Sequence, residues 1–263
     1  MQIFDLEQPR TADMPVHPSH RPGYSYVLHR RHQDHYHPEQ NGPRTGASGM
    51  IVCMEHTGTH IDALSHQADD LKLFGDIQVD NQIQTSRGFT QLGVEEIPPI
   101  VAPGVLLDVA TLHGVEILEA GYAITVGDLE TCCERQSVII DPGNVVLVRT
   151  GNAHYWNDSE RYLAGPGVAG SASQWLADHG VLAVGADTMA WDVIGVKDPD
   201  LGCDLPGHLI LLARQGIYII ENLQLEELAA AKHYRFTFIC LPLKCVGATG
   251  SPVRPIALVP EIL

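Results

Sequence analysis

Four side chains that commonly bind metals lie within one segment of eleven residues, at His56, His60, Asp62 and His66. Neutral imidazole and carboxylate groups are ligands that zinc and manganese take readily. Three such ligands hold a metal and leave a position open for water, whose pKa falls towards neutrality so that a nearby base can take its proton. The alternative is a loop of solvated histidines with a capping aspartate, which explains this density of ligand-type residues less well. No Glu follows His56, so the segment does not match the H-E-x-x-H pattern of zinc proteases.

The residues around this segment predict a strand followed by a tight turn. Residues 50–55 are mostly apolar and favour a strand. One Gly and two Thr separate His56 from His60, and these residue types disfavour the interior of a helix. Gly58 allows the backbone to turn sharply or to approach a metal or substrate closely. If the chain is extended after the turn, His60 and Asp62 project to the same side.

The rest of the chain alternates short apolar runs with short helical segments. Strands are expected at residues 104–110, 181–187, 217–220 and 234–240, and residues 138–148 predict an element, a Pro-Gly turn and a buried strand. Helices are expected at residues 115–120, 126–135, 171–179, 208–215 and 225–231. Residues 67–103 are rich in Gly and Pro and predict loops and short elements. This recurrence indicates an α/β fold, and we expect one domain over residues 1–263, because a chain of this length can bury a large core.

Charge and cysteine content limit the partners and the compartment. Asp and Glu number 32 against 16 Lys and Arg, a net charge of −16, which argues against nucleic acid or an anionic membrane as partner. Six cysteines without a C-x-x-C pair indicate free thiols in a reducing compartment. The first residues lack the basic and apolar regions of a signal peptide, and no apolar run reaches the length of a membrane span. We therefore expect a cytoplasmic protein that acts on a small molecule.

Residues 1–49 are rich in Pro, Gly and His and predict a lid-like segment. Four histidines lie within nine residues, from His29 to His37. A metal cluster is one interpretation, but no ligand spacing repeats and Pro and Gly punctuate the segment, which favours a surface loop that covers a pocket. Tyr36 in this loop would then face the substrate. His17 and His20 are expected to be unrelated to a metal.

Further candidates follow predicted buried strands, where site residues commonly lie. Trp156 is in a polar and aromatic loop after residues 138–148, and Trp191 lies beyond residues 181–187. We expect both in the pocket wall, although ordinary packing would equally explain Trp156. Glu221 ends the apolar run 217–220, and a buried carboxylate needs a partner charge or a metal. His208 begins a predicted helix, where a lone histidine is usually a surface or capping residue.

The motifs, in this order along the chain, resemble those of the cyclase family of metal-dependent hydrolases, which includes bacterial kynurenine formamidases and isatin hydrolases. Residues 56–66 fit H-x-G-T-H-x-D-x-x-x-H, residues 208–223 fit H…LL…GI…IEN-L, and residues 242–254 resemble PL…L-x-G-x-x-G-S-P-x-R, with Cys245 in place of the second Leu. Many members carry Pro in the segment that is Ala63-Leu64-Ser65 here. The resemblance implies a mixed-sheet α/β domain of the swivelling β/β/α type, homodimers or homotetramers, and one or two divalent ions, Mn²⁺ or Zn²⁺. It also implies that His208 and Glu221 belong to the metal centre.

The resulting hypothesis is a metal-dependent hydrolase that cleaves an amide or a cyclic amide, similar to isatin hydrolases because the N-terminal segment is long. His66 would be the general base, and Glu221 a further ligand or proton carrier. The predicted metal ligands are His56, His60, Asp62 and His208. Alternatives are an aryl-formamide hydrolase similar to kynurenine formamidase, a lactone hydrolase, and a non-catalytic protein whose metal is closed off by four protein ligands.

Overall fold

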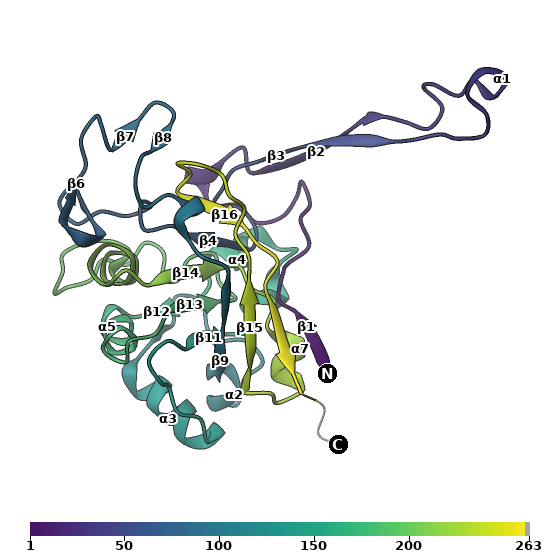
Figure 1. The fold of residues 1–263 in the computed structure, drawn as a ribbon. Coiled ribbons are helices and arrows are strands. Elements are labelled where there is room, and N and C mark those ends of the chain that lie inside the picture. Colours follow the sequence, from purple (N-terminus) through teal and green to yellow (C-terminus); the bar gives the residue numbers. More distant parts are fainter. Residues whose placement is uncertain (261–263) are drawn as a thin grey trace.

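A mixed sheet forms the centre of the protein. The computed structural model describes residues 1–260, and in these residues the largest sheet has nine strands in the order β1-β17-β15-β9-β11-β13-β14-β4-β16 (Figure 1). Central strands β9, β11, β13 and β14 are parallel, and the pairings on both sides of them are antiparallel. This arrangement confirms the predicted mixed-sheet α/β fold. The strands of this sheet are β1 (Gln2–Asp5), β4 (His60–Asp62), β9 (Ile100–Asp108), β11 (Val145–Arg149), β13 (Ala183–Ala186), β14 (Tyr218–Glu221), β15 (Arg235–Cys240), β16 (Gly250–Pro252) and β17 (Ile256–Val259).

Helices connect the parallel strands, as parallel pairing requires a crossover. Between β9 and β11 lie α2 (Val109–Leu112) and α3 (Val126–Gln136), and between β11 and β13 lie α4 (Ser159–Leu163) and α5 (Gly170–Asp178). Helix α6 (Pro206–His208) continues as a π-helical segment (Leu209–Gln215) before β14, and α7 (Glu226–Ala230) follows that strand. A capping box of Thr125 and Asp128 fixes the start of α3.

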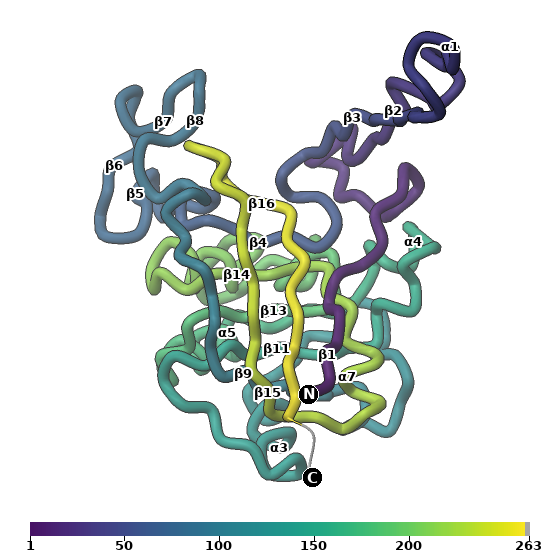
Figure 2. The backbone as a smooth tube through the Cα atoms, turned by 45° about the vertical axis from the view of Figure 1, so that its right-hand side comes forward, coloured from purple at the N-terminus to yellow at the C-terminus, as the bar shows by residue number. Residues whose placement is uncertain are grey.

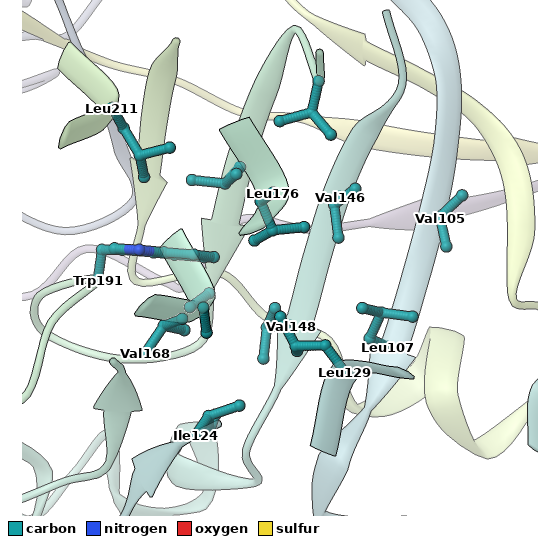
Figure 3. Packing of buried hydrophobic residues seen from close by; sticks show 14 of the residues in the cluster. Val105, Leu107, Ile124, Leu129, Val146, Val148, Val168, Leu176, Trp191 and Leu211 are labelled. Carbon is teal, nitrogen blue, oxygen red and sulfur yellow. The ribbon is translucent and has the colours of Figure 1, made fainter. Parts of the chain in front are cut away.

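The sheet is buried on both faces. Side chains alternate along a strand, so Val146 and Val148 of β11 face one core while Leu147 between them faces the other. Figure 3 shows the first core, where Leu129 of α3 and Leu176 of α5 pack with the β11 valines. This double burial explains why the central strands read as continuous apolar runs in the sequence.

A long hairpin leaves this body. Strands β2 (Tyr24–Arg30) and β3 (Ser48–Cys53) pair with each other and project outwards, with α1 (Pro38–Asn41) at the far end (Figures 1 and 2). We call residues 24–53 the arm. The remaining short pairs are β5 (Lys72–Leu73) with β6 (Ile77–Gln78), β7 (Gln84–Thr85) with β8 (Gly88–Phe89), and β10 (Ala123–Ile124) with β12 (Gly167–Val168). Short 3₁₀ turns occur at Pro18–His20, Phe74–Asp76, Val94–Glu96 and Asn152–Tyr155.

Most predicted elements are confirmed, with boundaries shifted by a few residues, but the helix predicted at residues 115–120 is wrong. The helix lies earlier, at α2, because Asp108 caps its start by accepting a hydrogen bond from the backbone N–H of Thr111. Gly114, with φ of 70°, then ends the helical turn. Within residues 1–260 no helix is both long and apolar enough to cross a bilayer.

Candidate metal centre

Two neighbouring strands bring the first ligand-type side chains together. In the antiparallel pair of β4 and β14, Glu221 lies directly opposite His60, so both project from the same face of the sheet. Asp62 is two residues further along β4 and shares that face. His60 Nε2 lies 3.4 Å from Asp62 Oδ1 and 3.4 Å from Glu221 Oε2. The predicted extended geometry after the turn at Gly58, whose φ is 65°, is confirmed.

The turn before β4 and the segment after it add two more histidines. His56 Nδ1 lies 2.7 Å from Asp62 Oδ1. The ring of His66 stacks on the ring of His56, with centroids 3.9 Å apart. Two sets of possible ligand atoms result, each within 4.8 Å, and both contain Asp62: one is His56, Asp62 and His66, the other His60, Asp62 and Glu221.

His208 reaches the same place from a distant part of the chain. Its Nε2 lies 3.2 Å from Glu221 Oε1 and 3.7 Å from Asp62 Oδ2. Its Nδ1 lies 2.7 Å from Asp192 Oδ2, and this carboxylate also accepts hydrogen bonds from the backbone N–H groups of Gly207 and His208. Asp192 therefore fixes the orientation of the His208 ring, as carboxylates commonly do for metal-binding histidines.

The buried histidines and carboxylates of the cluster shift one another's pKa values. Burial opposes protonation of His208, but Asp192 and Glu221 outweigh it and raise the pKa well above the usual value. For His60, burial is likewise outweighed by Asp62 and Glu221, and the pKa is raised. Burial would raise the pKa of Asp62, but the surrounding histidines hold it well below its usual value. The cluster thus keeps the Asp62 carboxylate ionised and favours positive charge beside it.

The hydrogen bonds around His56 show that acceptor atoms of the cluster have no donor among the described residues. Thr249 Oγ1 donates its proton to Glu55 Oε1 at 2.5 Å, so the 2.8 Å bond between Thr249 Oγ1 and His56 Nε2 is donated by the histidine. In its neutral form, His56 then presents the lone pair of Nδ1 to the acceptor oxygen of Asp62. The other Asp62 oxygen, Oδ2, is buried and has no hydrogen-bond partner among the described residues. A cation beside Asp62 would bind the lone pair of His56 Nδ1 and would give Asp62 Oδ2 a partner, so these residues fit a metal ion.

A cavity of about 420 Å³ opens above the ligand cluster. Its walls include His17 and His20, which were predicted to be unrelated to a metal. The His20 ring lies 5.1 Å from the His56 ring, and burial next to His56 lowers its pKa. Nothing in the spacing of His17 and His20 indicates this position, because it depends on how residues 1–23 fold over the body. Met189, Ile194 and Leu205 supply apolar wall.

The residues predicted to bind substrate lie elsewhere. Trp156 is buried against Tyr162 and donates a hydrogen bond to the backbone oxygen of Pro9. Trp191 is fully buried in the core, although its backbone N–H donates to Glu221 Oε1. Tyr36 is exposed near the tip of the arm. None of the three lines the cavity above the ligand cluster. Trp156 has the packed environment that was given as its alternative, and the buried position of Trp191 was not expected.

Comparison with known proteins identifies the family. The model of the cyclase family matches residues 4–193, well over half of the chain, so the chain belongs to that family. A kynurenine formamidase of Sphingopyxis alaskensis is 27% identical over 257 residues, covering 97% of both chains. A crystal structure described as a novel cyclase has a TM-score of 0.85 and 28% identity over 98% of this chain and 88% of that one.

An isatin hydrolase A from Ralstonia solanacearum gives a TM-score of 0.73 at 25% identity, covering 98% of this chain and 92% of that one. The predicted family is therefore confirmed, and with it the expectation of an enzyme of the hydrolase class. The individual roles predicted for the site residues rest on the geometry above.

Proposed function

We propose that this chain is a metal-dependent hydrolase that opens a cyclic amide, with isatin-like compounds as the substrate class. The observation that carries the proposal is the pair of ligand sets sharing Asp62 at the floor of a cavity of about 420 Å³. That volume is within the range of pockets that bind small molecules. The similarity in fold and sequence to an isatin hydrolase favours a cyclic amide, and an open formamide, the substrate class named for the kynurenine formamidase relative, is the alternative.

When bound, a divalent metal would polarise the scissile carbonyl and acidify a water molecule. The proposed ligands are His56, His60, Asp62 and His208, with Glu221 as an additional ligand. Their nitrogen and oxygen donors suit both Mn²⁺ and Zn²⁺, and the two ligand sets have room for one ion or two. We favour Mn²⁺. A cytoplasmic location belongs to the same proposal.

In this proposal His66 carries the proton. Burial lowers its pKa to about 3, so the imidazole is neutral at pH 7 and its lone pair is free to accept a proton from the attacking water. The same proton can pass to the nitrogen that leaves when the amide bond breaks. The His66 ring lines the cavity and stacks on the ring of the proposed ligand His56.

Metal removal tests the function. Protein stripped with a chelator should lose turnover of isatin and regain it when Mn²⁺ or Zn²⁺ is added back. Parallel assays with N-formylkynurenine and with an aromatic lactone separate the cyclic amide from the aryl-formamide and lactone alternatives. Undiminished turnover in fully stripped protein would overturn the metal-dependent mechanism. A loaded protein that turns over none of these compounds would favour a non-catalytic metal site.

A His66→Ala variant separates a base from a ligand. As a base, His66 should leave metal content unchanged while turnover falls about 10²–10⁴-fold. As a ligand within the set of His56 and Asp62, its loss should reduce metal content together with turnover. Unchanged turnover would exclude both roles.

A further inference from the structure

The outer end of the arm (residues 24–53) contains a cavity lined by basic and polar side chains. It encloses about 350 Å³ between the end of β2 and the loop that leads to β3, far from the central sheet (Figures 1 and 2). Among the residues that the structure describes, none that lines this cavity is acidic. The side chains that line it can all donate hydrogen bonds, and they are Arg30, His32, His35, Asn41, Arg44 and Thr45.

The two arginines of this cavity have no carboxylate partner. Within residues 1–260 neither the Arg30 nor the Arg44 guanidinium forms an ion pair or donates a hydrogen bond. Arginines that line other cavities are paired, since Arg214 lies 2.7 Å from Asp69 and Arg10 lies 2.9 Å from Glu7. Two positive charges that line one small cavity repel each other, and an anion between them would remove that repulsion.

Local backbone structure directs Arg30 towards the cavity and closes the loop around it. A bulge interrupts the pairing of β2 with β3 between Leu28 and Arg30, and bulges commonly redirect a neighbouring side chain. A Cβ atom at position 46 would lie 3.1 Å from Arg30 Nη2, so Gly46 leaves room for the guanidinium. His32 Nδ1 and Thr45 Oγ1 share a hydrogen bond of 2.8 Å, which joins the two sides of the loop. These contacts give the cavity a defined shape.

The donors of the cavity favour an anion of the phosphate type. A guanidinium binds phosphate through two parallel N–H···O bonds, and a phosphate group has enough oxygen atoms for two guanidinium groups and neutral donors together. A phosphate monoester carries about −1.5 to −2 charges at pH 7, which balances Arg30 and Arg44. A carboxylate carries a single charge and two oxygen atoms, so it would leave one arginine without a partner.

The charge of the rest of the chain favours a small ion over a large anionic surface. The arm contains three arginines and two acidic residues, a balance of +1. The whole chain has 16 basic and 32 acidic residues, so the remainder has 13 and 30, a balance of −17. A nucleic acid or an anionic membrane would be repelled by this body, whereas a small ion contacts only the end of the arm.

We propose that the arm binds a small phosphate-type anion, inorganic phosphate or a soluble phosphate monoester, between Arg30 and Arg44. Asn41 and Thr45 supply neutral donors, and the histidines of the arm that line the cavity act as donors instead of metal ligands. No residue of this site lines the cavity above the ligand cluster. The proposal therefore does not rest on the proposed hydrolase function.

Isothermal titration calorimetry of inorganic phosphate into the full, metal-loaded chain tests the site. Low ionic strength is needed, because salt screens exposed charges. Arg30→Gln and Arg44→Gln should each weaken phosphate binding about 10–100-fold, the usual cost of losing a hydrogen bond between charged groups. The matched control is Arg87→Gln, which removes an exposed arginine of another loop that also has no ion pair within residues 1–260, and it should leave the affinity unchanged.

The same titrations separate this site from phosphate bound at the metal centre. Phosphate on the metal would bind equally well to the wild type and to both arm variants. Circular dichroism shows whether each variant is folded. Equal affinity in the wild type and the folded arm variants, or no phosphate binding by the wild type, would overturn the proposal.

Two further measurements locate the anion and identify its source. Phosphate should shift the backbone amide signals of Asn41, Thr45 and Gly46 in ¹H–¹⁵N NMR spectra, and shifts confined to the body would contradict the site. Vesicles of phosphatidylcholine and phosphatidic acid present the same phosphate chemistry on a membrane, and the protein should not sediment with them. Sedimentation that depends on Arg30 and Arg44, without binding of free phosphate, would assign the cavity to a lipid headgroup and overturn the proposal. None of these outcomes depends on turnover.

Discussion

Strands β3 and β4 are separated by six residues, yet their environments are opposite. Each residue of β4 is buried, because the strand lies between β14 and β16 in the sheet. In β3 every residue but the last is exposed, because the strand pairs with β2 alone. Both segments contain apolar residues with strand propensity. The number of neighbouring strands, which is a property of the whole fold, decides which segment becomes core and which becomes an exposed surface.

The two histidine clusters differ in the same way. The histidines at the turn and on β4 are drawn into the interior beside Asp62, where charge must be compensated. The four between His29 and His37 lie exposed on the arm, and within residues 1–260 they belong to neither possible ligand set. Density of histidines alone therefore does not mark a metal site, whereas histidines beside a buried carboxylate do.

The largest effect should come from removing the carboxylate at the centre of the buried cluster. Asp62 belongs to both ligand sets, so Asp62→Ala should lower metal affinity roughly 10³-fold, because loss of an outer-sphere partner alone costs about 10–100-fold. Metal affinity can be measured by competition with a chromophoric chelator. The control is Asp5→Ala, which breaks an exposed pair with Arg254 and should leave affinity unchanged. Normal metal binding by Asp62→Ala would remove the basis of the site.

The second largest effect should come from a substitution on the opposite face of β4. Ile61 is fully buried between His60 and Asp62 in sequence and faces the second core. Ile61→Ala should reduce the free energy of unfolding by about 2–5 kcal/mol, the usual range for removing a large aliphatic side chain from a core. Denaturant unfolding followed by circular dichroism measures the change. A loss below 1 kcal/mol would mean that β4 is held in the sheet by the contacts of His60 and Asp62 and not by the packing of Ile61.

Local patterns predicted much of this architecture because they depend on neighbouring residues. The motif of residues 56–66 gave the ligand types, and the turn at Gly58 gave their direction. The position of His20 at the cavity, and of Thr249 beside His56, depends on contacts between residues far apart in the chain. For Trp156 the sequence allowed both a pocket and a packing role, and for Trp191 it indicated only the pocket; both side chains are buried away from the cavity. Residues 1–49 were predicted to be lid-like, and the outward direction of the arm, which contains part of that segment, has no local signal.

A smaller effect should follow from loosening His56 without removing a ligand. Thr249→Val removes the hydroxyl that accepts the hydrogen bond of His56 Nε2 while keeping the shape of the side chain. Metal affinity should fall about tenfold, at the low end of the cost of losing an outer-sphere partner. Thr249→Ser keeps the hydroxyl and should bind as the wild type does. Equal losses in both variants would point to packing of the missing methyl group.

The smallest effect should come from a substitution on the arm, measured as the free energy of unfolding. Ile51 matches Ile61 in residue type but is 64% exposed. Ile51→Ala should change the free energy of unfolding by no more than about 0.5 kcal/mol, as for other surface positions. Denaturant unfolding of wild type and variant, followed by circular dichroism, measures the change. A loss of several kcal/mol would mean that Ile51 packs against the body of its own chain, contrary to the exposed arm.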